Sequence, residues 1–197
     1  MKNRAAATAA ITLTALLALA GCAGTTGSGG TDNMSGMGSS ASVAPAADVN
    51  DADMQFTMMM IPHHEQAVEM ADMILGKDGI DGQVVTLAEQ IKAAQGPEIE
   101  LMESWLDDWD TPMGDMDGMD HGGMMSDTDM QALEVATGAE ASRLFLEQMI
   151  VHHEGAIKMA QTEVDNGQNT DVIAIAEAII ASQTTEIDTM EDILATF

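Results

Sequence analysis

The chain has 197 residues, of which 33 are Asp or Glu and only 6 are Lys or Arg, so its formal net charge at pH 7 is -27. Such an acidic protein is not expected to bind nucleic acid or to dock directly on an anionic membrane surface, because both repel it. The single cysteine excludes a disulfide framework. We expect most of the carboxylates to form a solvated coat that also concentrates cations around the protein.

Residues 1–22 have the pattern of a secretory signal. Lys2 and Arg4 precede an apolar stretch that is too short for a good transmembrane span, and the stretch ends at Leu19-Ala20-Gly21-Cys22. These four residues resemble a bacterial lipobox, in which Cys22 is lipidated; the alternative is an ordinary cleaved signal with an incidental cysteine. Because each buried methylene contributes about 0.8 kcal/mol, a multiply acylated Cys22 would anchor the protein stably to the outside of the cell membrane.

Residues 23–50 are rich in Gly, Ser, Thr and Ala and show no apolar periodicity. This composition predicts a flexible tether between the membrane and the folded part of the chain. Residues 51–197 have the size of one ordinary domain.

An internal repeat organises that domain. Residues 56–71, FTMMMIPHHEQAVEMA, align with residues 145–160, FLEQMIVHHEGAIKMA, at an offset of 89. A second pair of segments, 89–102 and 177–190, aligns at an offset of 88. Apolar residues recur at helical spacing in all four, so each repeat is predicted to be a helical hairpin with a short Gly/Asn loop.

Neither hairpin can bury its apolar stripe alone, and no strand pattern is present. The sequence therefore predicts an all-α four-helix bundle made of two duplicated hairpins. Pro62 and Pro97 fall inside helical patterns and predict a kink or a late start there.

Residues 110–129 join the two repeats and lack a helical period, which predicts a mobile, Met-rich crossover loop. Its candidate metal ligands, which we expect to be exposed, are Met113, Met116, Met119, His121, Met124 and Met125. Thioethers are good ligands for Cu(I) and Ag(I), particularly beside imidazole. The alternative is a low-complexity linker in which methionine is incidental.

Each predicted helix carries polar residues in the middle of its apolar stripe. They are His63, Gln95 with Glu98, His152, and Gln183 with Glu186. Because burying such groups unpaired costs a few kcal/mol each, we expect them to meet in one central layer. Two imidazoles and two carboxylates there would suit a metal site; a hydrogen-bonded layer that fixes helix register is the alternative. The Glu-x-x-His spacing of di-iron bundles is absent.

His64 and His153 point about 100° away from the stripe and are therefore expected at the shoulder of the bundle. Met60 and Met149 lie four residues earlier, so each Met/His pair could chelate one ion. Glu65 and Glu154 are expected on the surface or behind a metal ligand.

The two His-His-Glu segments resemble the duplicated signature of the domain-of-unknown-function 305 family, over residues 51–197. The resemblance implies a secreted, ferritin-like four-helix bundle. Met- and His-rich members of this family are associated with binding copper and silver outside the cytoplasm. The resemblance therefore implies that the positions to test are Met60, His63, His64, Met149, His152 and His153.

These observations favour a lipoprotein that sequesters or transfers copper, as Cu(I) or Cu(II), and also silver, with a donor or acceptor protein as partner. One alternative is an oxidoreductase that uses a central His/Glu site with iron or manganese, metals that rank below copper here. Another is a structural or partner-binding bundle without metal. We expect that the protein is not an enzyme, because the sequence contains no nucleophile–base pair, no phosphate-binding glycine motif and no tyrosine.

Overall fold

The computed structural model describes residues 49–112 and 122–197, which form five helices and no strand. The helices are α1 (Asp51–Leu75), α2 (Gly82–Asp108), α3 (Asp127–Val135), α4 (Gly138–Asn166) and α5 (Thr170–Leu194). None of these helices is long and apolar enough to cross a membrane. The predicted signal with Cys22 lies outside the described residues, as do nearly all of the tether and Met113, Met116, Met119 and His121.

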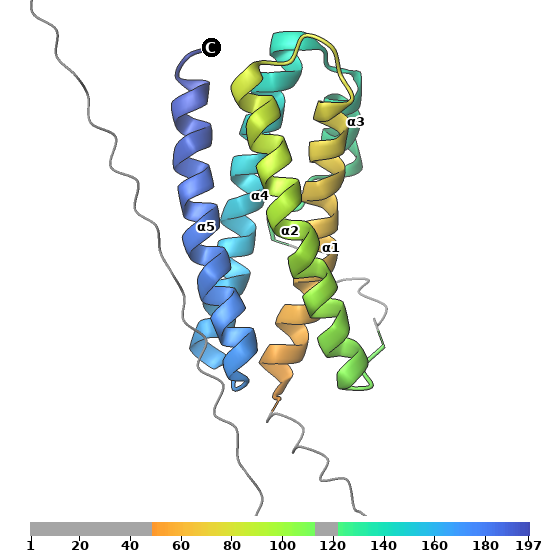
Figure 1. Ribbon diagram of the computed structural model, residues 1–197, viewed down its shortest axis with the longest axis vertical. Helices are drawn as coiled ribbons and strands as arrows, with labels where there is room; N and C mark the ends of the chain where they lie inside the picture. Colours follow the sequence, from red (N-terminus) through yellow and green to blue (C-terminus); the bar gives the residue numbers. More distant parts are fainter. Residues whose placement is uncertain (1–48, 113–121) are drawn as a thin grey trace, which may run out of the picture. The chain divides into compact units, whose positions relative to one another are not determined.

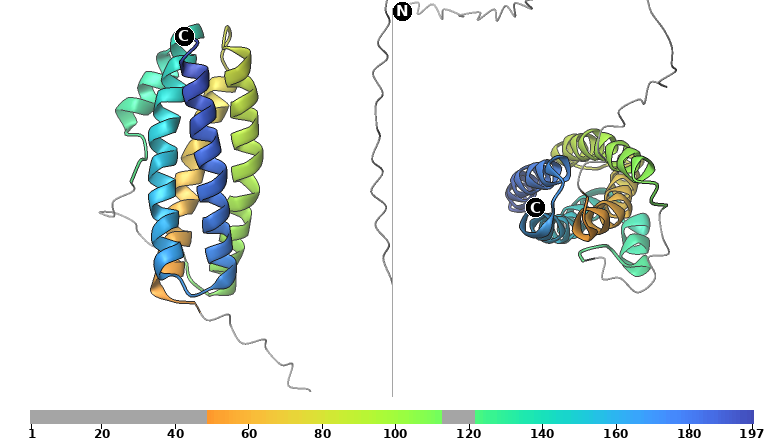
Figure 2. Two further views of the ribbon diagram at one scale, coloured as in Figure 1. Left: turned by 90° about the vertical axis from the view of Figure 1, so that its left-hand side faces the viewer. Right: turned by 90° about the horizontal axis from the view of Figure 1, so that it is seen from below.

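The four long helices form a bundle, which confirms the predicted all-α fold (Figure 1). Within the bundle α1 packs against α2, α4 packs against α5, and α1 packs against α4. The view along the bundle in Figure 2 shows the four helices as a ring, with α3 outside it against α1 and α4. Each sequence repeat is thus one hairpin, and the two hairpins meet through α1 and α4.

Capping residues set where the first two long helices begin. The Asn50 side chain accepts hydrogen bonds from the backbone N–H groups of the first turn of α1, and the Asp81 side chain does the same for α2. Both helices therefore begin well before Pro62 and Pro97, which lie inside them. The predicted late start at these prolines is wrong.

The apolar residues of the bundle form two separate buried clusters. One includes Met70, Ile74, Leu87, Phe145, Met149 and Met190. The other includes Phe56, Met60, Met102, Ala156 and Ile179. On each long helix one or two buried polar residues lie between its contributions to the two clusters, so a polar layer crosses the middle of the core. These residues are His63 and His64, Gln95, His152 and His153, and Gln183.

The segment that leads into α3 is packed rather than exposed. Ser126 caps α3, which begins at Asp127, so the last three residues of the predicted loop are helical. The Gln66 amide holds the backbone of Met125 through two hydrogen bonds, of 2.7 and 3.0 Å, and the Met125 side chain packs against the first apolar cluster. Met124 and Met125 are both half-buried, so the expectation that they are exposed is wrong.

Asp53 ties the start of α1 to the loop between α4 and α5. Its carboxylate accepts hydrogen bonds from the backbone N–H groups of Asn50 (2.6 Å), Gln168 (3.1 Å) and Asn169 (2.9 Å). Burial alone would raise the pKa of Asp53, but these bonds and one from Glu163 lower it. Burial, followed by the hydrogen bond to Asp53 and the charge of Asp53, raises the pKa of Glu163 to about 8. Asp53 is therefore ionised and Glu163 protonated at neutral pH.

This carboxyl pair predicts a fall in stability as pH rises. Between its ordinary pKa of 4.5 and the folded value of about 8, Glu163 binds more protons in the folded than in the unfolded chain. The free energy of unfolding therefore decreases across this range. Glu163→Gln stays neutral and can still donate to Asp53, so its urea midpoint should fall less between pH 5 and pH 8 than that of the wild type. Equal falls in the two proteins would contradict the assignment.

The segment formed by Gly122 and Gly123 packs closely on α4 at Gly155. A Cβ atom on Gly155 would lie 2.0 Å from the carbonyl oxygen of Gly122, whereas one on Gly96, also inside a helix, would meet nothing within 4 Å. We expect Gly155→Ala to destabilise the protein by about 1–3 kcal/mol through overpacking. Gly96→Ala should change the stability by less than about 1 kcal/mol, because the added Cβ atom meets no neighbour. Urea unfolding measures both, and equal effects would rule out the close approach.

Candidate metal site

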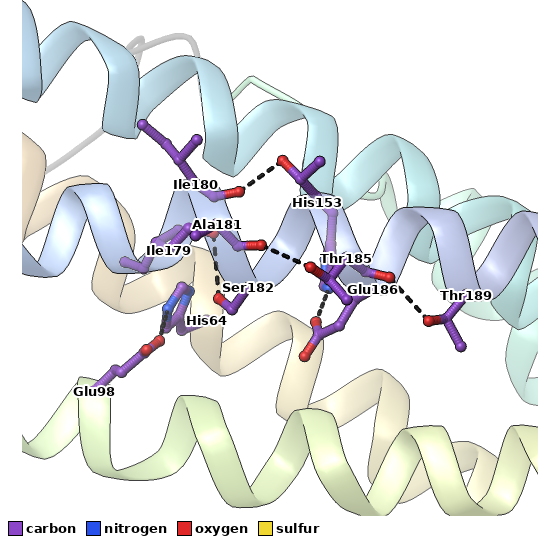
Figure 3. Close-up of polar contacts among 11 residues, drawn as sticks. His64, Glu98, His153, Ile179, Ile180, Ala181, Ser182, Thr185, Glu186 and Thr189 are labelled. Atoms are coloured by element: carbon purple, nitrogen blue, oxygen red, sulfur yellow. Dashed lines mark hydrogen bonds and ion pairs between the residues drawn. The ribbon is translucent and has the colours of Figure 1, made fainter.

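Two histidine–carboxylate pairs occupy the polar layer. Nε2 of His64 lies 2.7 Å from Oε2 of Glu98, and Nε2 of His153 lies 2.6 Å from Oε2 of Glu186. Figure 3 shows Glu98 reaching His64 from α2 and Glu186 reaching His153 from α5. Both imidazoles are fully buried, whereas each glutamate side chain is 19% exposed. The pairs occupy equivalent positions in the two repeats.

These pairs fix the hydrogen positions on the two rings. A carboxylate only accepts hydrogen bonds, so Nε2 of His64 and of His153 carries the hydrogen. In a neutral ring, Nδ1 then holds a lone pair. Nδ1 of each ring is buried and has no hydrogen-bond partner among residues 49–112 and 122–197. Histidine ligands of metals typically have a carboxylate behind one nitrogen while the other binds the ion.

His63 and His152 lie beside each other where α1 meets α4. Their ring centroids are 3.7 Å apart and the rings are tilted by 40°. Burial, and then the proximity of His63, His153 and His64, lowers the pKa of His152 well below its ordinary value, so this ring is neutral. The other three imidazoles are therefore close enough to His152 to act on it electrostatically.

Both ring nitrogens of His152 are buried without a hydrogen-bond partner in the described part of the chain. The same is true of both polar atoms of the Gln95 amide. A buried polar group in this condition costs about 1–3 kcal/mol, and a metal ion is one way to satisfy it. The donor set of the layer therefore fits a metal ion.

The site is not assembled as the sequence predicted. Glu98 and Glu186 pair with His64 and His153 instead of His63 and His152. The shoulder position expected for His64 and His153 is wrong, because both are fully buried. The reason is that α1 and α4 each contact more than one helix, so each buries a wider arc than a single stripe.

Met60 and Met149, expected beside those histidines at the shoulder, are also fully buried and belong to the two apolar clusters. Glu65 and Glu154 are exposed, as predicted. Among the described residues, no group of three or more His, Asp or Glu side chains is placed to hold one ion. The polar layer therefore contains metal-binding side chains, but three of them do not point at one common position in the described part of the chain.

Sequence reasoning missed the buried pair Asp53 and Glu163. The repeat contained the signal, because the equivalent positions at an offset of 89 are Ser142 and Ile74. Glu163 aligns with Ile74, which is a core residue, so apolar packing alone does not explain the glutamate.

The profile of DUF305, a domain of unknown function, matches residues 53–194. The chain belongs to this family. None of the proteins with curated descriptions matches it.

Solved structures of DUF305 proteins agree with the fold. A DUF305 protein from Streptomyces coelicolor that is assigned as secreted is 34% identical over 74% of this chain and 93% of its own, with a TM-score of 0.69. A DUF305 fragment from Deinococcus radiodurans is 31% identical over 76% of this chain and 99% of its own, with a TM-score of 0.70. CopM with Cu(II) bound is 32% identical over 73% of this chain and 96% of its own, with a TM-score of 0.64. CopM has also been solved with Cu(I) and with silver.

The neutral, buried His152 predicts acid sensitivity in this DUF305 protein. Its lowered pKa means that the unfolded chain binds more protons as pH falls below 6.5, so stability is present above pH 6.5 and lost below it. We expect metal-free His152→Leu to lose less stability between pH 7 and pH 5 than the wild type. At pH 7 it should be destabilised by less than about 1.5 kcal/mol, because the volumes are similar. Urea midpoints at the two pH values test this, and an undiminished acid loss would contradict it.

Proposed function

We propose that this protein binds copper and silver outside the cytoplasm and sequesters the ion or passes it to a partner protein. The observation that carries the proposal is the pair of buried imidazoles of His64 and His153. The Nε2 atom of each ring is hydrogen-bonded to a glutamate, Glu98 or Glu186. With His63 and His152 beside them, four imidazoles lie in one layer that is shielded from water.

The available donors favour copper over hard cations. Calcium and magnesium need several oxygen ligands, whereas imidazole suits copper and thioether suits Cu(I) and Ag(I). Met60 and Met149 lie one helical turn before His64 and His153 and are as deeply buried. Binding of Cu(I), Cu(II) and silver by the related CopM supports the same ions here.

Glu98 and Glu186 act in this proposal by orienting histidines. Rotation of the imidazoles would bring the free Nδ1 atoms of His64 and His153 to one ion, with His63, His152 or a thioether completing its ligands. The loop residues Met113, Met116, Met119, His121, Met124 and Met125 would serve as exchangeable ligands during transfer, since thioethers bind weakly. Iron or manganese would need more carboxylate ligands than these pairs leave available.

The location rests on the N-terminus. The signal ending at Cys22 directs the chain across the cytoplasmic membrane, and lipidation of Cys22 holds it there through acyl chains, the only contact with the membrane that we propose. The secreted assignment of the Streptomyces coelicolor relative supports export.

The test is a competition titration of the mature protein carrying Cys22→Ser with Cu(I), Cu(II), Ag(I), Zn(II) and Fe(II). Glu98→Gln combined with Glu186→Gln should weaken copper binding by about 10–100-fold, because an amide can donate to the ring and select the wrong tautomer. Glu65→Gln combined with Glu154→Gln is the matched control, since these exposed glutamates occupy the same two motifs.

Replacing all four paired histidines by Gln should abolish binding at this layer, and deleting residues 114–125 should slow exchange with a competing chelator. Copper binding that is no tighter than that of an acidic control protein, and equal in every variant, would refute the proposal. It would leave a structural bundle in which the polar layer fixes helix register.

A further inference from the structure

A cavity of about 160 Å³ opens between the start of α1 and the end of α4. Its walls include Phe56, Met59, Met159 and Glu163, and none of the four paired histidines lines it. It therefore presents two thioether side chains and one carboxyl group away from the layer described above, together with the side chains of Gln55 and Thr162.

The other sequence repeat shows what the fold alone requires at this place. At an offset of 89, Phe56 corresponds to Phe145, and Met70 corresponds to Met159. Glu163, by contrast, corresponds to Ile74 in the apolar core, and Met59 corresponds to Gln148, which donates a hydrogen bond to the α3 carbonyl of Asp129 (2.9 Å). The carboxyl group and the second thioether are therefore additions at one end of the bundle.

The Glu163 carboxyl group is buried without a conventional donor. The residue is 1% exposed, and neither oxygen accepts a hydrogen bond from a described nitrogen or hydroxyl group. Its polar neighbour is Asp53, itself a carboxylate that already accepts three backbone hydrogen bonds. Gly167 provides the space, because a Cβ atom there would lie 2.0 Å from Oε1 of Glu163.

The two thioethers lie at the margin of the apolar core. Met59 is 9% exposed but belongs to neither apolar cluster, and its sulfur accepts a long hydrogen bond from Nε2 of Gln55 (3.7 Å). Met159 is half-buried at the edge of the second cluster. Both side chains are unbranched and flexible, so their sulfur atoms can turn toward the cavity.

We propose that Met59, Met159 and Glu163 form a second metal site, for a soft monovalent cation, Cu(I) or Ag(I). Two thioethers select a soft ion. Glu163 is protonated at neutral pH in the metal-free protein, so binding releases its proton to solvent, and the resulting carboxylate supplies the one negative charge that balances the ion. Hard divalent cations are disfavoured because the cavity has too few oxygen ligands for them. The site extends the proposed copper function, but it does not depend on the histidines.

The test is an Ag(I) titration of the mature protein carrying Cys22→Ser and methyl-13C-labelled methionine, followed by NMR. The Met59 and Met159 methyl resonances, assigned by single Leu substitutions, should shift on binding, and they should also shift in His64→Gln/His153→Gln. Met59→Leu combined with Met159→Leu should bind one Ag(I) fewer than the wild type. Met70→Leu, which changes the repeat counterpart of Met159, should bind the same number as the wild type.

Glu163→Gln, which preserves shape and the capacity to donate to Asp53, should weaken Ag(I) binding at this site at least tenfold. Unshifted Met59 and Met159 resonances, or an unchanged number of bound ions in the double Leu variant, would overturn the second site. Unchanged Ag(I) binding in the His64/His153 variant would instead count against the histidine layer, so the two proposals fail separately.

Discussion

The fold depends on a polar layer across the middle of an apolar four-helix core. Two apolar clusters, one toward each end of the bundle, hold the helices together. Between them lie the two His-His pairs, Gln95, Gln183, Glu98 and Glu186. Because buried polar groups must find partners, each hairpin is fixed in register by its own histidine–glutamate pair, His64–Glu98 or His153–Glu186. Within residues 49–112 and 122–197, Nδ1 of His64 and Nδ1 of His153 remain without hydrogen-bond partners, and these two atoms carry the proposed chemistry.

Duplication explains why the two halves of the layer are alike. Some positions elsewhere nevertheless differ between the two repeats. Gly155 stands where the first repeat has Gln66, and the crossover segment passes against that glycine before Gln66 holds Met125. At the end of the bundle where α1 begins, Asp53 and Glu163 occupy positions at which the other repeat has Ser142 and Ile74. Of these unshared positions, Gly155 and Gln66 guide the connection, and Glu163 lines the cavity beside Met59.

Helical periodicity and the repeat were sufficient to predict the hairpins, because each helix has to bury an apolar stripe and the two halves have the same pattern. They also identified part of the central layer, but His64 and His153 were expected outside it. They could not say which carboxylate meets which histidine, because that depends on how far each helix is rotated about its axis. Rotation is set by contacts with neighbouring helices, so His64 and His153 lie inside the bundle although their angle on the helix suggests its shoulder.

The sequence by itself determined the number of long helices, their pairing into hairpins and a side-chain inventory rich in methionine with a single cysteine, because these follow from periodicity, duplication and composition. Only the tertiary structure decided that Glu98 and Glu186 hold His64 and His153, that Met125 packs instead of lying exposed, and that Glu163 is buried beside Asp53. Each of these depends on the approach of segments far apart in the chain. The physical reason is that burial and electrostatic partners are properties of the packed assembly, and no single helix carries them.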